Sequence, residues 1–225
     1  MDVAPIVALA VLAVAAVAGN LLFPPREARI ERELAAEPRA LIAEAQDTVR
    51  LVGRVRRVDE LLQAPLSGRP CVAYALLVDQ AVTAGSQGMS NWRRRVEIQQ
   101  ARPFIVADET GEARVDTSGP VRMALVYDRS GATSWLREYP GKYRELSLCL
   151  ESAGIGATNW LGRWKGFRYG EGVIEEGQVV TVGGSSAREV DPGGIRPGPR
   201  SMPELLVLRG SEASPLLISG ERVES

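Results

Sequence analysis

Residues 49–58 read VRLVGRVRRV, and this stretch decides the fold of the body. Toward its end valine alternates with arginine, a period of two that is typical of a β-strand with one solvated face. Comparable runs recur along the chain. We expect strands over residues 71–82, 93–99, 104–106, 112–116, 121–127, 205–208 and 216–218, with a further pair around Ile174 and residues 179–182.

Helical signals in the body are few. Residues 142–152 form the clearest one, because they place Tyr143, Leu146 and Leu150 on one face of a helix. Many short strands with one or two helices predict a mostly β domain, α+β at its margins, that closes fully or partly into a barrel.

Turn and loop signals separate these elements. Residues 83–90 are rich in Gly and Ser, and residues 185–203 are rich in Pro and Gly, so both are expected to be loops. Residues 108–111, Asp-Glu-Thr-Gly, predict a hairpin turn with Gly111 in the left-handed conformation. The carboxylates around this turn are expected to serve local hydrogen bonding rather than catalysis.

An uncharged run precedes the body. Residues 3–23 contain no Asp, Glu, Lys or Arg, and as a helix they span about 30 Å, the thickness of a bilayer core. They predict a transmembrane helix that ends at Pro24-Pro25. All nearby basic residues follow it, so the positive-inside rule predicts a body in the cytoplasm; these residues are Arg26, Arg29, Arg32 and Arg39. The excess of 25 Arg over 2 Lys indicates a GC-rich bacterial genome, so we expect the bacterial inner membrane.

A cleaved signal peptide is the alternative. Ala16-Val17-Ala18 offers a small-residue cleavage pattern, but no basic residue precedes the apolar run. N-terminal sequencing of the mature protein distinguishes the two, since cleavage would place the body outside. We expect the anchor at residues 3–23, a helical juxtamembrane stalk at 24–47 interrupted by Pro38, a β domain at 48–220 and a tail at 221–225.

Composition excludes several functions. The net charge of −1 argues against nucleic-acid binding, which needs a basic excess. The chain has no histidine, which excludes histidine-activated nucleophiles and histidine metal ligands. Cys71 and Cys149 are too few for a closed zinc site and are expected to be small core residues. We therefore assign no catalytic residue, metal or cofactor.

Three motifs, in order behind an apolar N-terminal run, resemble the GIDE family, whose domain is also called the beside-a-membrane (BAM) domain. They are APLSGRPCVAY at residues 64–74, PFIVAD at 103–108 followed by Gly111, and YGE at 169–171 followed by Gly177 and VTVG at 180–183. The resemblance covers residues 48–220. The family positions it marks are Pro65, Cys71, Tyr74, Phe104, Asp108, Gly111, Tyr169, Glu171, Gly177 and Gly183.

The resemblance implies a non-catalytic interaction or regulatory module that holds an unknown protein partner near a membrane. Eukaryotic members are ubiquitin ligases that add a second span and a zinc-binding RING. With two cysteines and no histidine this sequence lacks RING ligands, so a ligase-related protein by descent is the alternative. Autoubiquitination by the purified protein would favour that alternative.

An aromatic and basic segment, residues 159–169, is the candidate membrane contact. Aromatic rings prefer the bilayer interface, and Lys and Arg are attracted to an anionic leaflet. The alternative is that its rings cap the core. The candidate contacts are Trp160, Arg163, Trp164, Lys165, Phe167 and Arg168. Arg93, Arg94 and Arg95 are expected on a solvated edge strand, or in contact with an anion or partner.

Overall fold

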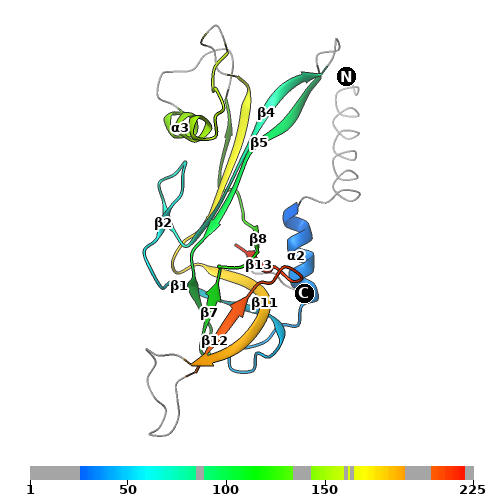
Figure 1. Cartoon of the computed structure of the whole chain (residues 1–225), viewed down its shortest axis with the longest axis vertical. Helices are drawn as coiled ribbons and strands as arrows, with labels where there is room; N and C mark the ends of the chain where they lie inside the picture. The colour runs from blue at the N-terminus through cyan, green and yellow to red at the C-terminus, as the bar shows by residue number, and fades with distance from the viewer. Residues whose placement is uncertain are drawn as a thin grey trace, which may run out of the picture.

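The computed structural model describes residues 26–84, 89–133, 143–159, 162, 165–190 and 204–220. The expected span at 3–23 and the tail at 221–225 lie outside these residues. Within the described part of the chain, no helix combines the length and the apolar character needed to cross a bilayer. Figure 1 shows two β structures along the long axis of the molecule, with α2 (Arg26–Ala36) beside them.

Five strands close into a barrel, which confirms the mostly β, barrel-like expectation. Their order is β1 (Thr48–Arg57), β6 (Phe104–Ala107), β7 (Glu112–Asp116), β12 (Glu204–Arg209) and β11 (Val179–Val190). Antiparallel pairing of β11 with β1 completes the ring, while β12 and β7 run parallel. On the same edge of β11, next to β12, lies β13 (Leu216–Ser219), which pairs in parallel with β8 (Val121–Ala124).

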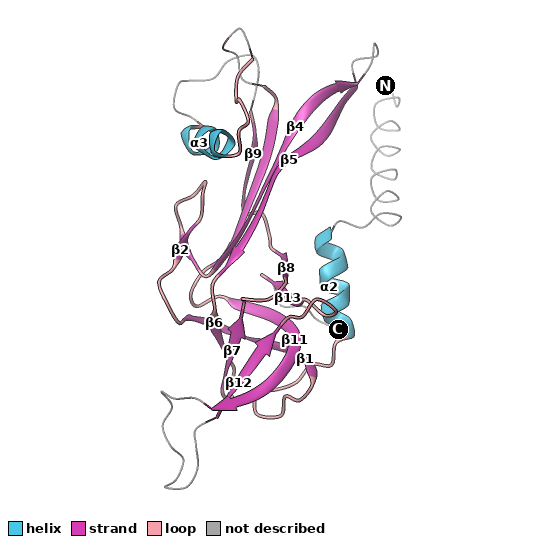
Figure 2. Ribbon diagram, in the orientation of Figure 1, coloured by secondary structure: helices cyan, strands magenta, loops and turns pink. Residues whose placement is uncertain are grey.

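A four-stranded antiparallel sheet extends away from the barrel (Figure 2). Its order is β5 (Met89–Ala101), β4 (Ala73–Ala84), β10 (Phe167–Ile174) and β9 (Arg129–Ala132). Helix α3 (Arg144–Ser152) packs Leu146 and Leu150 on one side of this sheet. A short ladder joins β2 (Leu62–Gln63) to β3 (Pro70–Cys71).

The residues of β1 show why the barrel forms. Leu51 and Val55 are fully buried inside it, whereas Arg54 and Arg56 face solvent. Gly53 lies so close to β6 that a Cβ atom there would approach the carbonyl oxygen of Ala107 to 2.6 Å. The expected solvated face is confirmed at Arg54 and Arg56, but Arg50 is buried, at 2% exposed, so the alternation does not extend over the whole run. Gly53 permits close strand contact.

Helix α2 is part of the folded body, so the expectation of a juxtamembrane stalk separate from the β domain is corrected. Ile30 and Leu34 are fully buried and pack with Ala124 and Leu217. A Cβ atom on Gly183 would lie 2.7 Å from Leu34, so the glycine makes room for the helix on β11. Apolar residues four apart gave the helix its buried stripe.

Residues after α2 are not helical. The helix ends at Ala36, two residues before Pro38, whose ring cannot continue it. The backbones of Pro38 and Ala40 then exchange hydrogen bonds with Arg50 on β1, at 2.9 and 3.1 Å. The amide of Ile42 donates to Asp108 at 2.9 Å. The part of the expected stalk after Ala36 is thus pinned to the barrel.

Other boundaries also differ from expectation. Strand β11 continues to Val190, because β12 supplies partners for residues that were expected to form a loop. Strands β4 and β5 extend into the expected loop at 83–90. The turn at 108–111 is present, but Asp108 stabilises it by accepting hydrogen bonds from Thr110 and Gly111. Among the described glycines, positive φ occurs at Gly68, Gly154, Gly162 and Gly177 rather than at Gly111.

We predict that Leu34→Ala lowers the free energy of unfolding by about 2–4 kcal/mol, because it opens a cavity between α2 and β11. Thermal and denaturant unfolding of the full chain in detergent, followed by circular dichroism, measures the change. Leu148→Ala is the matched control, since Leu148 is 57% exposed on α3. Equal stability of the two variants would contradict the packed position of α2.

Candidate functional site

The four-stranded sheet has one side covered by α3 and another that carries polar groups. Alternation along the strands decides the side of each residue. Leu76, Val78 and Phe167 point toward α3. Leu77 and Asp79 of β4 and Arg168 of β10 point the other way, with Arg94 opposite Asp79 on β5. We call this second side the open face; it comprises Leu77, Asp79, Trp92, Arg94, Glu97, Ser130, Ala132, Arg168 and Gly170.

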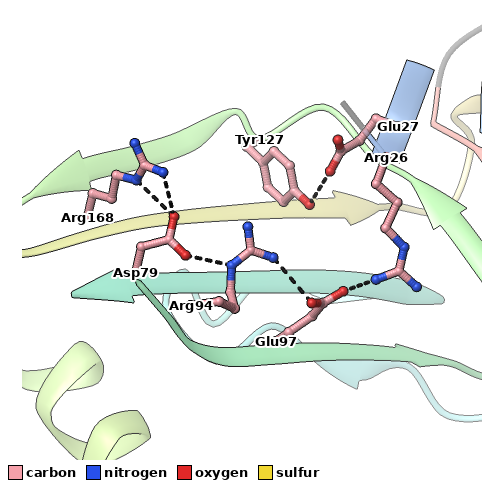
Figure 3. Close-up of polar contacts among 7 residues, drawn as sticks. All are labelled: Arg26, Glu27, Asp79, Arg94, Glu97, Tyr127 and Arg168. Atoms are coloured by element: carbon pink, nitrogen blue, oxygen red, sulfur yellow. Dashed lines mark hydrogen bonds and ion pairs between the residues drawn. The ribbon is translucent and has the colours of Figure 1, made fainter. Parts of the chain in front are cut away.

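Asp79 is the centre of the open face (Figure 3). Its carboxylate accepts hydrogen bonds from Nε of Arg94 at 2.6 Å and from Nε of Arg168 at 2.8 Å. Burial alone would raise the pKa of Asp79, but the two guanidinium groups outweigh it and hold the pKa below its ordinary value. A register shift between Val78 and Asp79 brings Arg94 opposite Asp79.

The network continues from Asp79 to α2. Arg94 also donates to Glu97 at 3.2 Å, and Glu97 forms an ion pair with Arg26, the first residue of α2. Next to this pair, Tyr127 donates its hydroxyl hydrogen bond to Glu27 at 3.0 Å. Charged groups thus connect the helix to three strands of the sheet, and Figure 3 shows them as one chain of contacts with Tyr127–Glu27 alongside.

The ring of Tyr127 packs over β10, where two glycines leave space for it and for the backbone beside it. A Cβ atom on Gly170 would lie 3.1 Å from the Tyr127 ring, and one on Gly172 would lie 2.6 Å from the carbonyl oxygen of Val126. The segment after β8 can therefore cross the open face in direct contact with the strand. Burial, with Glu27 nearby, raises the pKa of Tyr127 well above its ordinary value, so the phenol stays protonated.

Beyond Tyr127 the open face forms a shallow depression of about 550 Å³. Its floor includes Leu77 and the backbone of Gly131 and Gly170, and Asp79 and Arg168 line it. Arg168 also stacks over the Trp92 ring, with 4.8 Å from Cζ to the ring centroid. The depression therefore offers the apolar side chain of Leu77, two tyrosines, Tyr127 and Tyr169, and the guanidinium of Arg168, a combination found in binding sites.

Of the expected membrane-contact residues, Trp160, Arg163 and Trp164 lie outside the described residues. Arg168 is on the open face and its side chain is 52% exposed. Lys165 donates to the carbonyl oxygen of Gly156 at 2.9 Å. Phe167 is fully buried beneath α3, so its ring packs in the core, as the alternative for this segment expected.

The positions marked by the family resemblance have structural roles. Glu171 is fully buried and accepts hydrogen bonds from the amides of Leu66 at 2.6 Å and Ser67 at 3.0 Å. It thereby holds the turn that contains Pro65. Tyr74 donates its hydroxyl hydrogen bond to Gln100 at 2.7 Å.

The remaining family positions are spread over both structures. Phe104 is buried in the barrel, Asp108 and Gly111 form the β6–β7 turn, and Tyr169 packs its ring edge-on against Tyr143. Gly177 has φ of +87° in the turn before β11, and Gly183 lies under α2. Among these family positions, Tyr169 is the one that lines the depression on the open face.

Both cysteines are free and buried, as expected for small core residues. Burial raises the pKa of the Cys71 thiol to about 11, and it raises that of Cys149 as well. Neither thiol is therefore a reactive nucleophile. Within the described residues no cluster of three or more carboxylate, cysteine or histidine groups is arranged to hold a metal ion.

Sequence reasoning missed the centre of the open face. It noted Arg93, Arg94 and Arg95 but not Asp79, Glu97 or Tyr127. One usable signal was Asp79 itself, a lone acid inside the apolar run at residues 71–82. The bulge that pairs it with Arg94 leaves no mark in the sequence.

Comparison with protein-family models, with curated proteins and with solved structures finds no match for this chain.

We predict that the free energy of unfolding of Asp79→Asn falls less with decreasing pH than that of the unsubstituted protein. Because its folded pKa is depressed, Asp79 contributes stability above the unfolded pKa of about 4 and loses it as pH falls toward the lower folded value. Denaturant unfolding of both proteins between neutral and acid pH measures the difference, which should shrink below about pH 4. A difference that stays constant with pH would contradict the assignment.

We predict that Glu171→Ala costs roughly 2–4 kcal/mol of unfolding free energy, because the buried amide of Leu66 and the partly buried amide of Ser67 lose their acceptor. Glu171→Gln keeps one oxygen acceptor and should cost less. Glu175→Ala is a surface control, since the Glu175 side chain is 38% exposed and lies 3.6 Å from Arg69. Thermal unfolding compares the three, and a loss with Glu175→Ala as large as with Glu171→Ala would contradict the buried clamp.

Proposed function

We propose that this protein is a single-pass, membrane-anchored and cytoplasm-facing module of the GIDE type that binds or regulates a protein partner without catalysing a reaction. The anchor is the uncharged run at residues 3–23, and the module is the barrel with its attached four-stranded sheet. The ubiquitin-ligase alternative depends on descent alone and is tested by autoubiquitination.

The observation that carries the proposal is the position of α2. The apolar run ends at Phe23, and α2 begins three residues later at Arg26. This helix is not a free spacer, because Ile30 and Leu34 are buried against the body. An anchor at residues 3–23 is therefore coupled directly to the folded domain.

Polar contacts strengthen the same coupling. Glu33 accepts from Arg122 at 2.6 Å, and Arg26 pairs with Glu97 at the other end of the helix. A helix held at both ends and along its apolar stripe fixes which side of the body is nearest to the anchor. Such a fixed orientation suits a module that presents one surface to a partner at the membrane.

The described site supports binding more than chemistry. The carboxylate of Asp79 is committed to two arginines, and both thiols are buried and protonated. The open face instead offers guanidinium groups, an exposed tryptophan and a shallow depression. These are features of an interaction surface.

Alkaline carbonate extraction of membranes tests the anchor. We expect the full chain to stay in the pellet and a variant lacking residues 3–23 to be released. A reporter fused to the C-terminus should show activity in the cytoplasm and none outside it. Carbonate-soluble full chain, a mature N-terminus at Gly19, or an external reporter would contradict the proposal.

A further inference from the structure

We propose that the outer edge of β5 accepts an extended segment of a partner protein as an additional strand, and that this segment alternates apolar with acidic side chains. The inference rests on the protein-binding role in the proposed function, and it adds the place of contact and the chemistry of the partner. The contact lies at residues 89–95, the part of β5 nearest to the turn from β4, which we call the β5 edge.

Strand β5 is the outermost strand of the four-stranded sheet (Figure 2). It is 13 residues long, and among the described residues β4 is the one strand that pairs with it. Its other edge therefore carries main-chain groups that a further strand can bond. The opposite edge strand, β9, is less suited, because it has four residues and the carbonyl oxygen of Ala132 accepts from the Tyr143 hydroxyl at 3.1 Å.

The hydrogen-bond pattern of the sheet shows which main-chain groups of the β5 edge point outward. The amide of Ala81 on β4 donates to Gly166, next to β10, at 2.8 Å, so the main-chain groups of Ala81 point away from β5. Trp92 lies opposite Ala81, and Arg93 lies opposite Gln80. Hydrogen-bonded and non-hydrogen-bonded pairs alternate along an antiparallel ladder. Arg93 therefore bonds β4, while the amide and carbonyl groups of Trp92 point outward.

Two arginines of the β5 edge lack a described counter-ion. Arg94 is bound to Asp79 and Glu97, but neither Arg93 nor Arg95 forms an ion pair with a residue that the structure describes. Both are exposed, and Arg95 is the extra residue of the bulge, without a partner on β4. In an added strand, the residue opposite Arg93 occupies a non-hydrogen-bonded position, where Cα atoms approach to about 4.5 Å. An acidic side chain there would supply the missing counter-ion.

Trp92 determines the alternate position of the added strand. Its ring is 42% exposed on the open face, where the guanidinium of Arg168 covers one side of it. A residue of the added strand opposite Trp92 places its side chain on the same face, next to the ring, and its neighbours point to the other face, with Arg93. An apolar residue opposite Trp92 and an acid opposite Arg93 therefore give the partner a period of two.

The charges of the β5 edge also select among occupants. Arginine on an edge strand, together with a bulge, discourages pairing with a basic or an uncharged strand. A second copy of β5 paired along this segment would bring three more arginines to the three already present. The open face, in which Arg94 and Arg168 are paired with Asp79, gives no preference for an anionic bilayer, and lipids offer no strand for the outward main-chain groups.

Peptide titration tests the β5 edge. The probe is a capped peptide of about eight residues that alternates valine and glutamate, added to the full chain in neutral detergent micelles. Two matched peptides carry lysine in place of glutamate or N-methyl groups on alternate amides. We expect the glutamate peptide to bind and both matched peptides to bind about tenfold or more weakly, because they lose the ion pairs or the main-chain bonds.

Charge-reversal variants test the role of the two arginines. Arg93→Glu/Arg95→Glu should weaken binding of the glutamate peptide about tenfold or more and strengthen binding of the lysine peptide. Arg114→Glu/Arg129→Glu is the matched control, because it makes the same change in net charge at exposed positions of β7 and β9. This control should leave both affinities within about twofold.

Amide hydrogen exchange, followed by NMR, gives a readout that needs no variant. The Trp92 amide should exchange rapidly in the free protein and about tenfold or more slowly once the glutamate peptide binds. The Arg93 amide, bonded to β4, should be protected in both states. Binding that leaves the Trp92 amide unprotected would show a contact between charges alone and would overturn the addition of a strand.

Other outcomes also decide the inference. A Trp92 amide protected in the free protein would show that the chain itself covers the edge or, where protection rises with protein concentration, that a second copy does; either result overturns the inference. Equal binding of the lysine or the N-methylated peptide overturns it as well. No binding by carbonate-resistant protein with a cytoplasmic reporter overturns the inference and leaves the proposed anchor and topology intact. Carbonate-soluble protein overturns the anchor, whereas the titration still decides the edge.

Discussion

Hydrogen bonds between β1 and β11 join the ends of the barrel, from Thr48 opposite Ser185 to Arg54 opposite Val179. The same strand β11 holds β12 and β13 on its other edge, so most of the barrel and its extension are paired through it. Gly183 lies within this strand and makes room for Leu34. The strand that closes the barrel therefore also provides the space into which Leu34 of α2 packs.

Two strands connect the barrel to the four-stranded sheet as one body. Ile174, at the end of β10, is buried in the barrel core, whereas Phe167, at its start, is buried under α3. In β4, Ala73 and Ala75 face the barrel core and Val78 faces α3. Because each strand contributes to both cores, the sheet and the barrel are joined through continuous strands.

Electrostatics on the open face follow from the same geometry. The buried carboxylate of Asp79 binds Arg94 and Arg168 from neighbouring strands. It thereby holds side by side two guanidinium groups that would otherwise repel each other. Glycines at 170 and 172 let the segment after β8 cross the sheet, and Tyr127 then meets α2 through Glu27. The result is a surface of paired charges next to α2, in which Arg94 and Arg168 contact Asp79 and Arg94 also contacts Glu97.

Much of the strand content could be predicted, because alternation in runs such as residues 49–58 reflects burial that each strand needs on its own. Helix α3 was also expected, at residues 142–152, and the structure begins it two residues later. Pairing partners could not be predicted in this way. Residues 185–190 looked like a loop and became strand when β12 supplied hydrogen bonds, and β9 is too short and polar to give a pattern.

The candidate site likewise has some features that the sequence predicted and others that depend on the tertiary structure. The sequence alone determined the uncharged run, the exclusion of histidine chemistry, the mostly β character and the excess of arginine at residues 93–95. Only the tertiary structure placed Asp79 between Arg94 and Arg168, buried Phe167 and packed α2 against the body. Local patterns record how each element meets water, whereas strand register, the bulge at Asp79 and the approach of α2 to Gly183 depend on partners that are far away in the chain.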